Sequence, residues 1–388
     1  MLNNFKRQYI LPSEGDFLHN QLSNCIDKLT EINKNNFLIQ LTFFIYSKTH
    51  IEYIERKRMI YDVLKKEFNK KIPAVSIIAQ YPDNKEISME IIYISKANKN
   101  IKVEYTFNFG INYSVVYSNG DKEIFAGGIS DDKLLSESHL DQANSAFRIM
   151  ESILQHESMT FANVIRQWNY IENIVGIASI DDKELQNYQI LNDVRTHYYS
   201  KSEFINGYPA ATAIGMNTGG IILEFYSSTS KDIIKPVKNF DQQNAYEYSQ
   251  SVLAGNSLYA KTQKSSPKFE RAKYINLHNH KKIFISGTAS IKNEHTIGIN
   301  NIIKQTEVTI DNIHKLISTK NLEANKIKNN YNSIEYSFMR VYVKNPEEMK
   351  LVKKICDASF PGIQINYLIA DICRENLLIE IEGEANLI

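Results

Sequence analysis

The sequence has no apolar stretch long enough to cross a membrane and no excess of either charge. Its longest apolar stretch, from Phe37 to Tyr46, already includes Gln40 and Thr42 and is much shorter than the roughly 20 residues of a membrane helix. Lys and Arg number 45 against 44 Asp and Glu, a formal net charge of +1. No overall field therefore favours nucleic acid or an anionic membrane, and we expect neither as a partner.

Cysteine is also scarce. Cys25, Cys356 and Cys373 are an odd, unclustered set, which argues against a disulfide framework and favours a reducing compartment. The first 16 residues contain no apolar core and no small-residue cleavage site, so we expect no export. The prediction is a cytoplasmic protein.

The chain is long enough for two or three domains, since 388 residues exceed the typical domain size of about 150. Five segments rich in β-branched and aromatic residues follow one another over residues 36–120, which predicts strands. The hydrophobic pattern predicts helices over residues 17–32, 136–155 and 182–199. We expect an N-terminal extension (1–35), a first domain (36–240), a polar linker (241–266) and a second domain (267–388).

The second domain repeats the order of the first. In each, a charged turn, an apolar strand and a Gly precede a helix that begins near a Gln, Gln142 or Gln305. Each copy ends on an apolar strand with a carboxylate, Glu224 in IILEF and Glu380 in LLIEIE. This order predicts an α+β fold made of two diverged copies in tandem, each a mixed β-sheet with helices packed on one face.

Short motifs in this order resemble the chorismatase family, a duplicated form of the RidA/YjgF-like fold. They are RQWNYIENI (166–174), NYQILNDVR (187–195), PAATAIG (209–215), AYEY (245–248), PKFERA (267–272), FISGTASI (284–291) and ADICRENLLIEIEG (370–383). The segment between AYEY and PKFERA is longer here than in the family pattern. Members of this family cleave chorismate and release pyruvate, so the resemblance implies chorismate as the small-molecule substrate.

Chorismate carries two carboxylates, and arginine suits such groups because its planar fork binds carboxylate bidentately and stays charged. Tyr188 and Arg195 are seven residues apart, nearly two helical turns, so they share one helix face. The resemblance implies that Tyr188, Arg195, Tyr248 and Arg271 bind the substrate. Without the resemblance, solvated or ion-paired surface arginines would be the simpler interpretation.

Glu380 is the candidate catalytic residue. On a strand, Glu380 and Glu382 point to the same face, and both could simply meet water. A desolvated carboxyl, by contrast, would stay protonated near neutrality and could protonate the methylene carbon of the enolpyruvyl group. The resemblance places the catalytic acid at Glu380, and this chemistry requires no metal or organic cofactor.

The resemblance also implies that Gly287 and Cys373 line the pocket and determine the product. One subtype admits water and forms a dihydroxycyclohexadiene carboxylate, whereas the other excludes water and forms a hydroxybenzoate. A small Gly with a neighbouring Cys resembles the subtype that forms 3-hydroxybenzoate. The sequence leaves the ring product and the oligomeric state open.

A RidA-like chain could also have one of two functions other than chorismate cleavage. An imine deaminase of the RidA type would need an Arg in the strand that begins PAATAIG or PGIQINYLIADIC, and neither contains one. A non-catalytic ligand-binding module would bind a chorismate-sized molecule without turnover.

Overall fold

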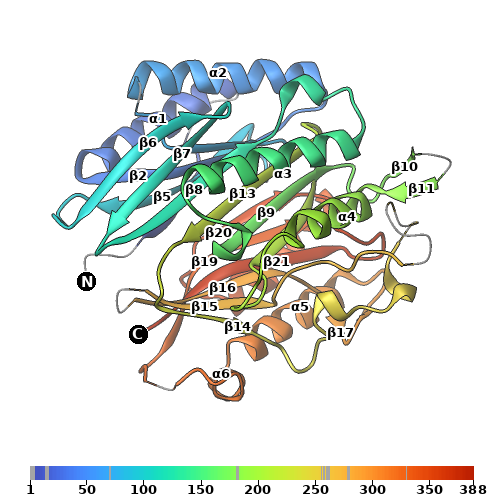
Figure 1. The fold of residues 1–388 in the computed structure, drawn as a ribbon. Helices are drawn as coiled ribbons and strands as arrows, with labels where there is room; N and C mark the ends of the chain where they lie inside the picture. Colours follow the sequence, from blue (N-terminus) through green and yellow to red (C-terminus); the bar gives the residue numbers. More distant parts are fainter. Residues whose placement is uncertain are drawn as a thin grey trace.

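The computed structural model describes residues 5–13, 17–69, 71–180, 183–254, 256, 258, 263–277, 280–328 and 330–388. Its strands lie in the interior in three main sheets, and its longer helices lie on the outside (Figure 1). Among the described residues, no helix is both long enough and apolar enough to cross a membrane.

The N-terminal sheet has the strand order β1-β5-β2-β3, with β2 and β3 parallel. Its elements are β1 (Lys6–Ile10), α1 (Leu18–Asn35), β2 (Asn36–Ile45), α2 (His50–Phe68), β3 (Ala74–Ile78) and β5 (Ile87–Ser95). The predicted N-terminal helix is confirmed as α1. The sequence did not predict α2, in which only Tyr53, Ile60 and Leu64 are fully buried and charged residues fill most other positions.

The middle sheet has the order β12-β9-β13-β8-β7-β6. Its elements are β6 (Ile101–Asn108), β7 (Ile111–Ser118), β8 (Asp121–Ile129), α3 (His139–His156), β9 (Val164–Glu172), α4 (Asn187–Tyr199), β12 (Ala210–Met216) and β13 (Ile221–Ser228). The helix predicted over 182–199 begins only at Asn187. Residues Lys183–Gln186 instead form β11, which pairs with β10 (Ile177–Ile180) in a hairpin.

The C-terminal sheet has the order β14-β15-β16-β21-β19-β20-β4. Its elements are β14 (Ile233–Val237), β15 (Ala272–Leu277), β16 (His280–Ala289), α5 (Ile302–Leu316), α6 (Thr319–Ala324), β19 (Ile334–Val343), α7 (Met349–Ser359), β20 (Ile365–Ile369) and β21 (Ile379–Leu387), with β4 (Tyr81–Pro82) at its edge. A small hairpin joins β17 (Ile291–Lys292) to β18 (His295–Thr296).

The expected pair of repeated units is confirmed by the topology. In the middle unit, β7, β8, α3, β9, α4, β12 and β13 follow one another and pair as β7-β8-β13-β9-β12. In the C-terminal unit, β15, β16, α5, β19, α7, β20 and β21 follow the same order and pair as β15-β16-β21-β19-β20. Each unit has one parallel pair, β9 with β12 and β19 with β20.

A third, shorter copy precedes these two. The N-terminal elements lack the first strand of the unit but otherwise keep its order and pairing, β1-β5-β2-β3. The sequence predicts an extension over residues 1–35, whereas β1 pairs with β5 and α1 buries Leu22, Cys25 and Leu29. β1 and α1 are therefore part of a folded unit, and the expected domain of 36–240 contains the rest of this unit as well as the next.

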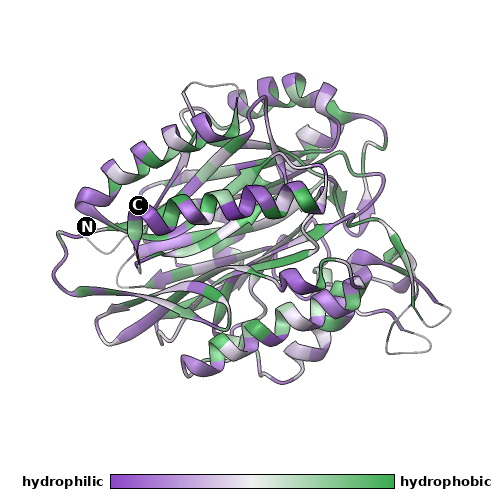
Figure 2. Cartoon of the chain, turned by 90° about the horizontal axis from the view of Figure 1, so that it is seen from above, coloured by the Kyte–Doolittle hydropathy of each residue, from purple (hydrophilic) through white to green (hydrophobic). Residues whose placement is uncertain are grey.

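Helices cover the outer faces of the sheets, and the inner faces meet in the interior. Figure 2 shows polar and apolar residues alternating along the helices, and green, apolar segments on the strands that lie between them. In α3, for example, Ala146, Phe147, Met150, Ile153 and Leu154 are buried in one core cluster. Burying this apolar face is what attaches the helix to its sheet.

A ring of buried glutamates links the three units at the centre. Each glutamate accepts hydrogen bonds from a matching pair of side chains in the neighbouring unit: Thr42 and Ser76 donate to Glu224, Trp168 and Thr212 to Glu382, and Arg340 and Asn366 to Glu90. Glu382 accepts a further hydrogen bond from Arg166. The partners occupy matching strand positions, because Glu90 is opposite Thr42, Glu224 opposite Trp168 and Glu382 opposite Arg340. The units are thus related by an approximate threefold repeat.

The register corrects one part of the predicted repeat. The bulge on β13 lies between Leu223 and Phe225, and the matching irregularity on β21 separates Ile381 from Gly383. The counterpart of Glu224 is therefore Glu382, whereas the sequence pairs it with Glu380. The position of Glu380 is occupied by Ile222 in the middle unit, so that unit has no counterpart of the candidate acid.

Candidate active site

A cavity of about 650 Å³ lies between the middle and C-terminal units. It is lined by α4 and β12 from one unit, by β16, β21 and the loop at 373–376 from the other, and by the segment that joins them. The sequence predicts a linker over 241–266, and Tyr248 and residues 251–254 of this stretch form part of the cavity wall. All seven candidate residues, Tyr188, Arg195, Tyr248, Arg271, Gly287, Cys373 and Glu380, line this one cavity.

Helix α4 supplies one side of the cavity. Tyr188, Asn192 and Arg195 all line it, as expected for residues spaced by about one helical turn. Arg195 is buried and donates from Nη2 to Oδ1 of Asn192, while its Nε and the Asn192 Nδ2 have no partner in the described part of the chain. Buried donors without partners are costly, so this corner of the cavity suits an anionic or carbonyl group.

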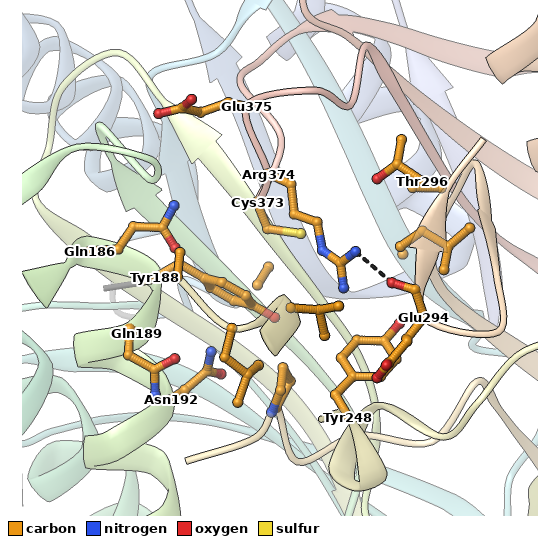
Figure 3. Close-up of a pocket in the computed structure, with 18 of the residues that line it drawn as sticks. Gln186, Tyr188, Gln189, Asn192, Tyr248, Glu294, Thr296, Cys373, Arg374 and Glu375 are labelled. Carbon is orange, nitrogen blue, oxygen red and sulfur yellow. Dashed lines mark hydrogen bonds between the residues drawn. The ribbon is translucent and has the colours of Figure 1, made fainter. Parts of the chain in front are cut away.

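Arg271 and Tyr248 form the opposite side. Arg271 Nη2 donates to the Tyr248 hydroxyl and to the Gln243 carbonyl, both at 2.6 Å. The guanidinium carbon also lies 5.6 Å from the centre of the Tyr248 ring, so the aromatic face helps to hold the cation. Figure 3 shows Tyr188 and Tyr248 approaching the cavity from opposite sides.

Sequence reasoning did not assign a third cation of the cavity, Arg374. Its Nη1 donates to the Glu294 carbonyl at 2.8 Å, and its guanidinium carbon lies 5.2 Å from the Tyr248 ring centre (Figure 3). Arg374 directly follows Cys373, but only the fold shows that both side chains reach the same cavity. With Arg195 and Arg271, it gives the cavity three arginines.

Glu380 is the carboxyl group of β21 that faces this cavity. It is only 4% exposed, and its side chain makes no hydrogen bond to any residue that the structure describes. Burial, together with the nearby Glu382 carboxylate, raises the pKa of Glu380 to about 8, although Arg166 and Arg271 act in the opposite direction. Glu380 is therefore largely protonated at neutral pH, as a general acid requires.

Gly287 provides the space that Glu380 occupies. It lies at the β16 irregularity opposite β21, and its N–H donates to the Thr212 hydroxyl at 3.0 Å. A methyl group at Gly287 would lie 2.0 Å from Oε1 of Glu380. The absence of a side chain at this position therefore permits the carboxyl group to point into the cavity.

Cys373 and Tyr188 remain neutral beside the acid. Burial and the nearby Glu380 carboxyl raise the pKa of the Cys373 thiol to about 12. Burial also raises the pKa of Tyr188. Neither group is an anion at neutral pH, so Glu380 is the only one of the three placed to exchange a proton with a bound molecule in that range.

The fold and the cavity define a class: an α+β protein of repeated units with a protonated carboxyl and several arginines at a unit boundary. Residues 103–227, within the middle unit, match the family model described as "Chorismatase FkbO/Hyg5-like, N-terminal". A crystal structure of a chorismatase covers 99% of this chain with a TM-score of 0.69 at 18% identity. That likeness shows that the two proteins share a fold over their whole lengths.

Two curated relatives come from Streptomyces hygroscopicus. A 3-hydroxybenzoate synthase is 30% identical over 234 residues, and a chorismatase is 27% identical over 228 residues. Each alignment covers 58% of this chain, and 64% and 62% of the two relatives, just under two thirds of their lengths. The resemblance to the chorismatase family predicted from the motifs is thereby confirmed.

Proposed function

We propose that the chain is a chorismatase that cleaves the enolpyruvyl ether of chorismate without a cofactor, using Glu380 as a general acid. The observation that carries this proposal is the Glu380 carboxyl itself, buried, with its pKa raised to about 8 and without a hydrogen-bond partner among the described residues, in a cavity with three arginines. The names of the similar proteins, chorismatase and 3-hydroxybenzoate synthase, support the same substrate.

The arginines lie where two carboxylates could be held apart. Arg195 belongs to the middle unit and Arg271 to the C-terminal unit, on different walls of the cavity. We propose that one binds the ring carboxylate and the other the enolpyruvyl carboxylate, with Tyr188 and Tyr248 as the aromatic walls. Bidentate contacts of this kind would fix the methylene carbon against Glu380.

The reaction begins with the Glu380 proton. Its transfer to the methylene carbon turns the vinyl ether into an oxocarbenium-like group. In the hydrolytic route, water adds to the carbon of this group, and collapse of the hemiketal releases pyruvate and leaves the ether oxygen on the ring as a hydroxyl. If the neighbouring hydroxyl of the substrate instead displaces the side chain at the ring carbon that bears it, the ring C–O bond breaks and pyruvate leaves without water. The hydroxyl proton then returns to the Glu380 carboxylate, and the ring rearranges to 3-hydroxybenzoate with no net consumption of water. The uncharged cavity wall at Cys373 favours this outcome, and 3-hydroxybenzoate is the proposed main product.

The decisive experiment is incubation of the purified protein with chorismate, followed by chromatography of pyruvate and the ring products. Equal amounts of pyruvate and 3-hydroxybenzoate are expected. If the protein instead forms pyruvate and the dihydroxycyclohexadiene carboxylate, it is still a chorismatase, but the assignment of 3-hydroxybenzoate as the product is wrong. Binding without pyruvate release would instead indicate a ligand-binding module.

We also propose that the protein works in the cytoplasm. Its cysteines are unpaired, and among the described residues no helix could span a membrane.

A further inference from the structure

Glu382, two residues beyond the acid on β21, is the most completely hydrogen-bonded carboxylate at the unit boundary. It is 2% exposed and accepts hydrogen bonds from five side chains: Arg166, Trp168, Thr212, Arg340 and Tyr342. Burial alone would raise the pKa of Glu382, but Arg340, Arg166 and the Thr212 hydroxyl hold it below the usual value. Glu382 is therefore a fixed anion.

Two structural links join Glu382 to Glu380. Both side chains lie on one face of the strand, so the charge of Glu382 acts on Glu380 through a water-poor interior. The second link runs through Thr212, whose hydroxyl donates to Glu382 and accepts from the Gly287 N–H. Gly287 is in turn the residue that makes room for the Glu380 carboxyl.

We infer that Glu382 is a positioning residue, which keeps its neighbour Glu380 protonated and ready to donate by presenting a fixed negative charge beside it. This inference rests on the proposed function, because it assigns the control of the acid that the proposed reaction uses. Of the three glutamates in the central ring, only Glu382 would have this role in controlling a neighbouring acid. At the other two, Glu90 and Glu224, no carboxyl group occupies the place of Glu380, where Ser88 and Ile222 lie.

The sign of the effect follows from the groups around Glu380. Glu382 on β21 opposes ionisation of the acid, whereas Arg166 on β9 and Arg271 before β15 favour it, and Tyr188 and Cys373 are neutral. Removing the Glu382 charge leaves the two cations unopposed. The acid then ionises at lower pH, and turnover is lost earlier as the pH rises.

The test is the pH dependence of kcat/KM for pyruvate release, which reports the ionisation of the free enzyme. In Glu382→Gln, the alkaline limb should move to lower pH by about one unit or more, with activity recovering toward pH 6. Glu382→Asp keeps the charge and should keep the limb near its wild-type position even if kcat falls. Glu90→Gln is the matched control, since it removes another carboxylate bonded to Arg340 but not one beside Glu380.

Arg166→Met should shift the alkaline limb of the kcat/KM profile in the opposite direction. It removes a cation that favours ionisation, so the limb should move to higher pH. This shift would show that the charges of the hydrogen-bonded cluster around Glu382 act on Glu380, even if Glu382→Gln fails to fold. An alkaline limb that stays at its wild-type position in the folded Glu382→Gln or Arg166→Met variant would overturn the inference. If Glu380→Gln retained full activity, the proposed function of Glu380 would fail instead, and the two failures are thus distinguishable.

Discussion

At the scale of single residues, Arg195 and Arg271 are buried cations on opposite walls of the cavity. Replacing either by Ala should weaken chorismate binding, because a substrate carboxylate would be desolvated without a charge-assisted partner, a loss of about 2–5 kcal/mol. Arg→Lys should restore only part of the loss, since an ammonium group cannot form the same fork. Steady-state kcat and KM for both alanine variants test this, with Arg148→Ala, outside the cavity, as the control.

Unchanged kcat and KM in both alanine variants would contradict the assignment of the anion sites. Arg374 would then be the first residue to examine, because it lines the same cavity. Its guanidinium already shares the Tyr248 ring with Arg271.

Cys373 is expected to influence which ring product forms. Shortening it to Ala would open space beside Glu380 and admit water, so the product mixture should move from 3-hydroxybenzoate toward the dihydroxycyclohexadiene carboxylate. Chromatography of the ring products measures the ratio. Cys25→Ala removes a buried thiol that lies outside the cavity, so it should leave that ratio unchanged. An unaltered product ratio in Cys373→Ala would remove Cys373 from product control.

Most of the site residues were predicted from the family motifs, because local sequence patterns alone did not distinguish them from surface residues. The family motifs brought Tyr188, Arg195, Arg271 and Glu380 together, and the structure places all of them in one cavity. Arg374 could not be assigned, because its place depends on a loop that the motifs do not fix in space. Glu382 could not be distinguished from a solvated strand residue, because its five donors come from three different strands.

At the scale of elements, the irregular pairing of β16 with β21 shapes the site. Gly287→Ala would place a methyl group against Glu380 Oε1 and push the carboxyl group out of its present position. We expect a fall in kcat of at least about tenfold, since general-acid catalysis contributes roughly 10²–10⁴-fold and depends on alignment. A thermal unfolding scan checks that the fold is intact. Wild-type turnover in this variant would contradict the role of Gly287 as space for the acid.

Elements with strong patterns were predicted best. The strands over residues 36–120 stand out by their β-branched and aromatic residues, and β2, β3, β5, β6 and β7 are confirmed there. Helix α2 was not predicted, because its apolar residues are interspersed with charged ones and only three of them, Tyr53, Ile60 and Leu64, are buried. The start of α4 was placed too early because Lys183–Gln186 is polar and its pairing with β10 is set by the hairpin.

At the scale of the whole molecule, Arg340 joins all three units. It is completely buried and donates to Glu90 of the N-terminal unit, Tyr170 of the middle unit, and Glu382 of its own. Arg340→Leu would leave two buried carboxylates short of a cation and should lower the free energy of unfolding by about 3–5 kcal/mol. Urea unfolding measures this. Lys201→Ala, which breaks the exposed pair with Glu151, should cost no more than about 1 kcal/mol.

A loss below about 1 kcal/mol in Arg340→Leu would mean that the central ring does not hold the units together. The repeat itself was predictable for the two complete units, whose turns, helices and closing strands follow one order. The N-terminal copy was not, because it lacks the first strand, and its central partners are Thr42 and Ser76 where the C-terminal unit has Arg340 and Asn366.

The most direct test of the central claim compares pyruvate release from chorismate by the wild-type protein and by Glu380→Gln. The amide keeps the shape of the side chain but has no acidic proton to give, so turnover should fall by about 10²–10⁴-fold while chorismate binding is retained. The wild-type rate should decline as the pH rises through about 8, where Glu380 ionises. Near wild-type turnover by Glu380→Gln at neutral pH would contradict the account.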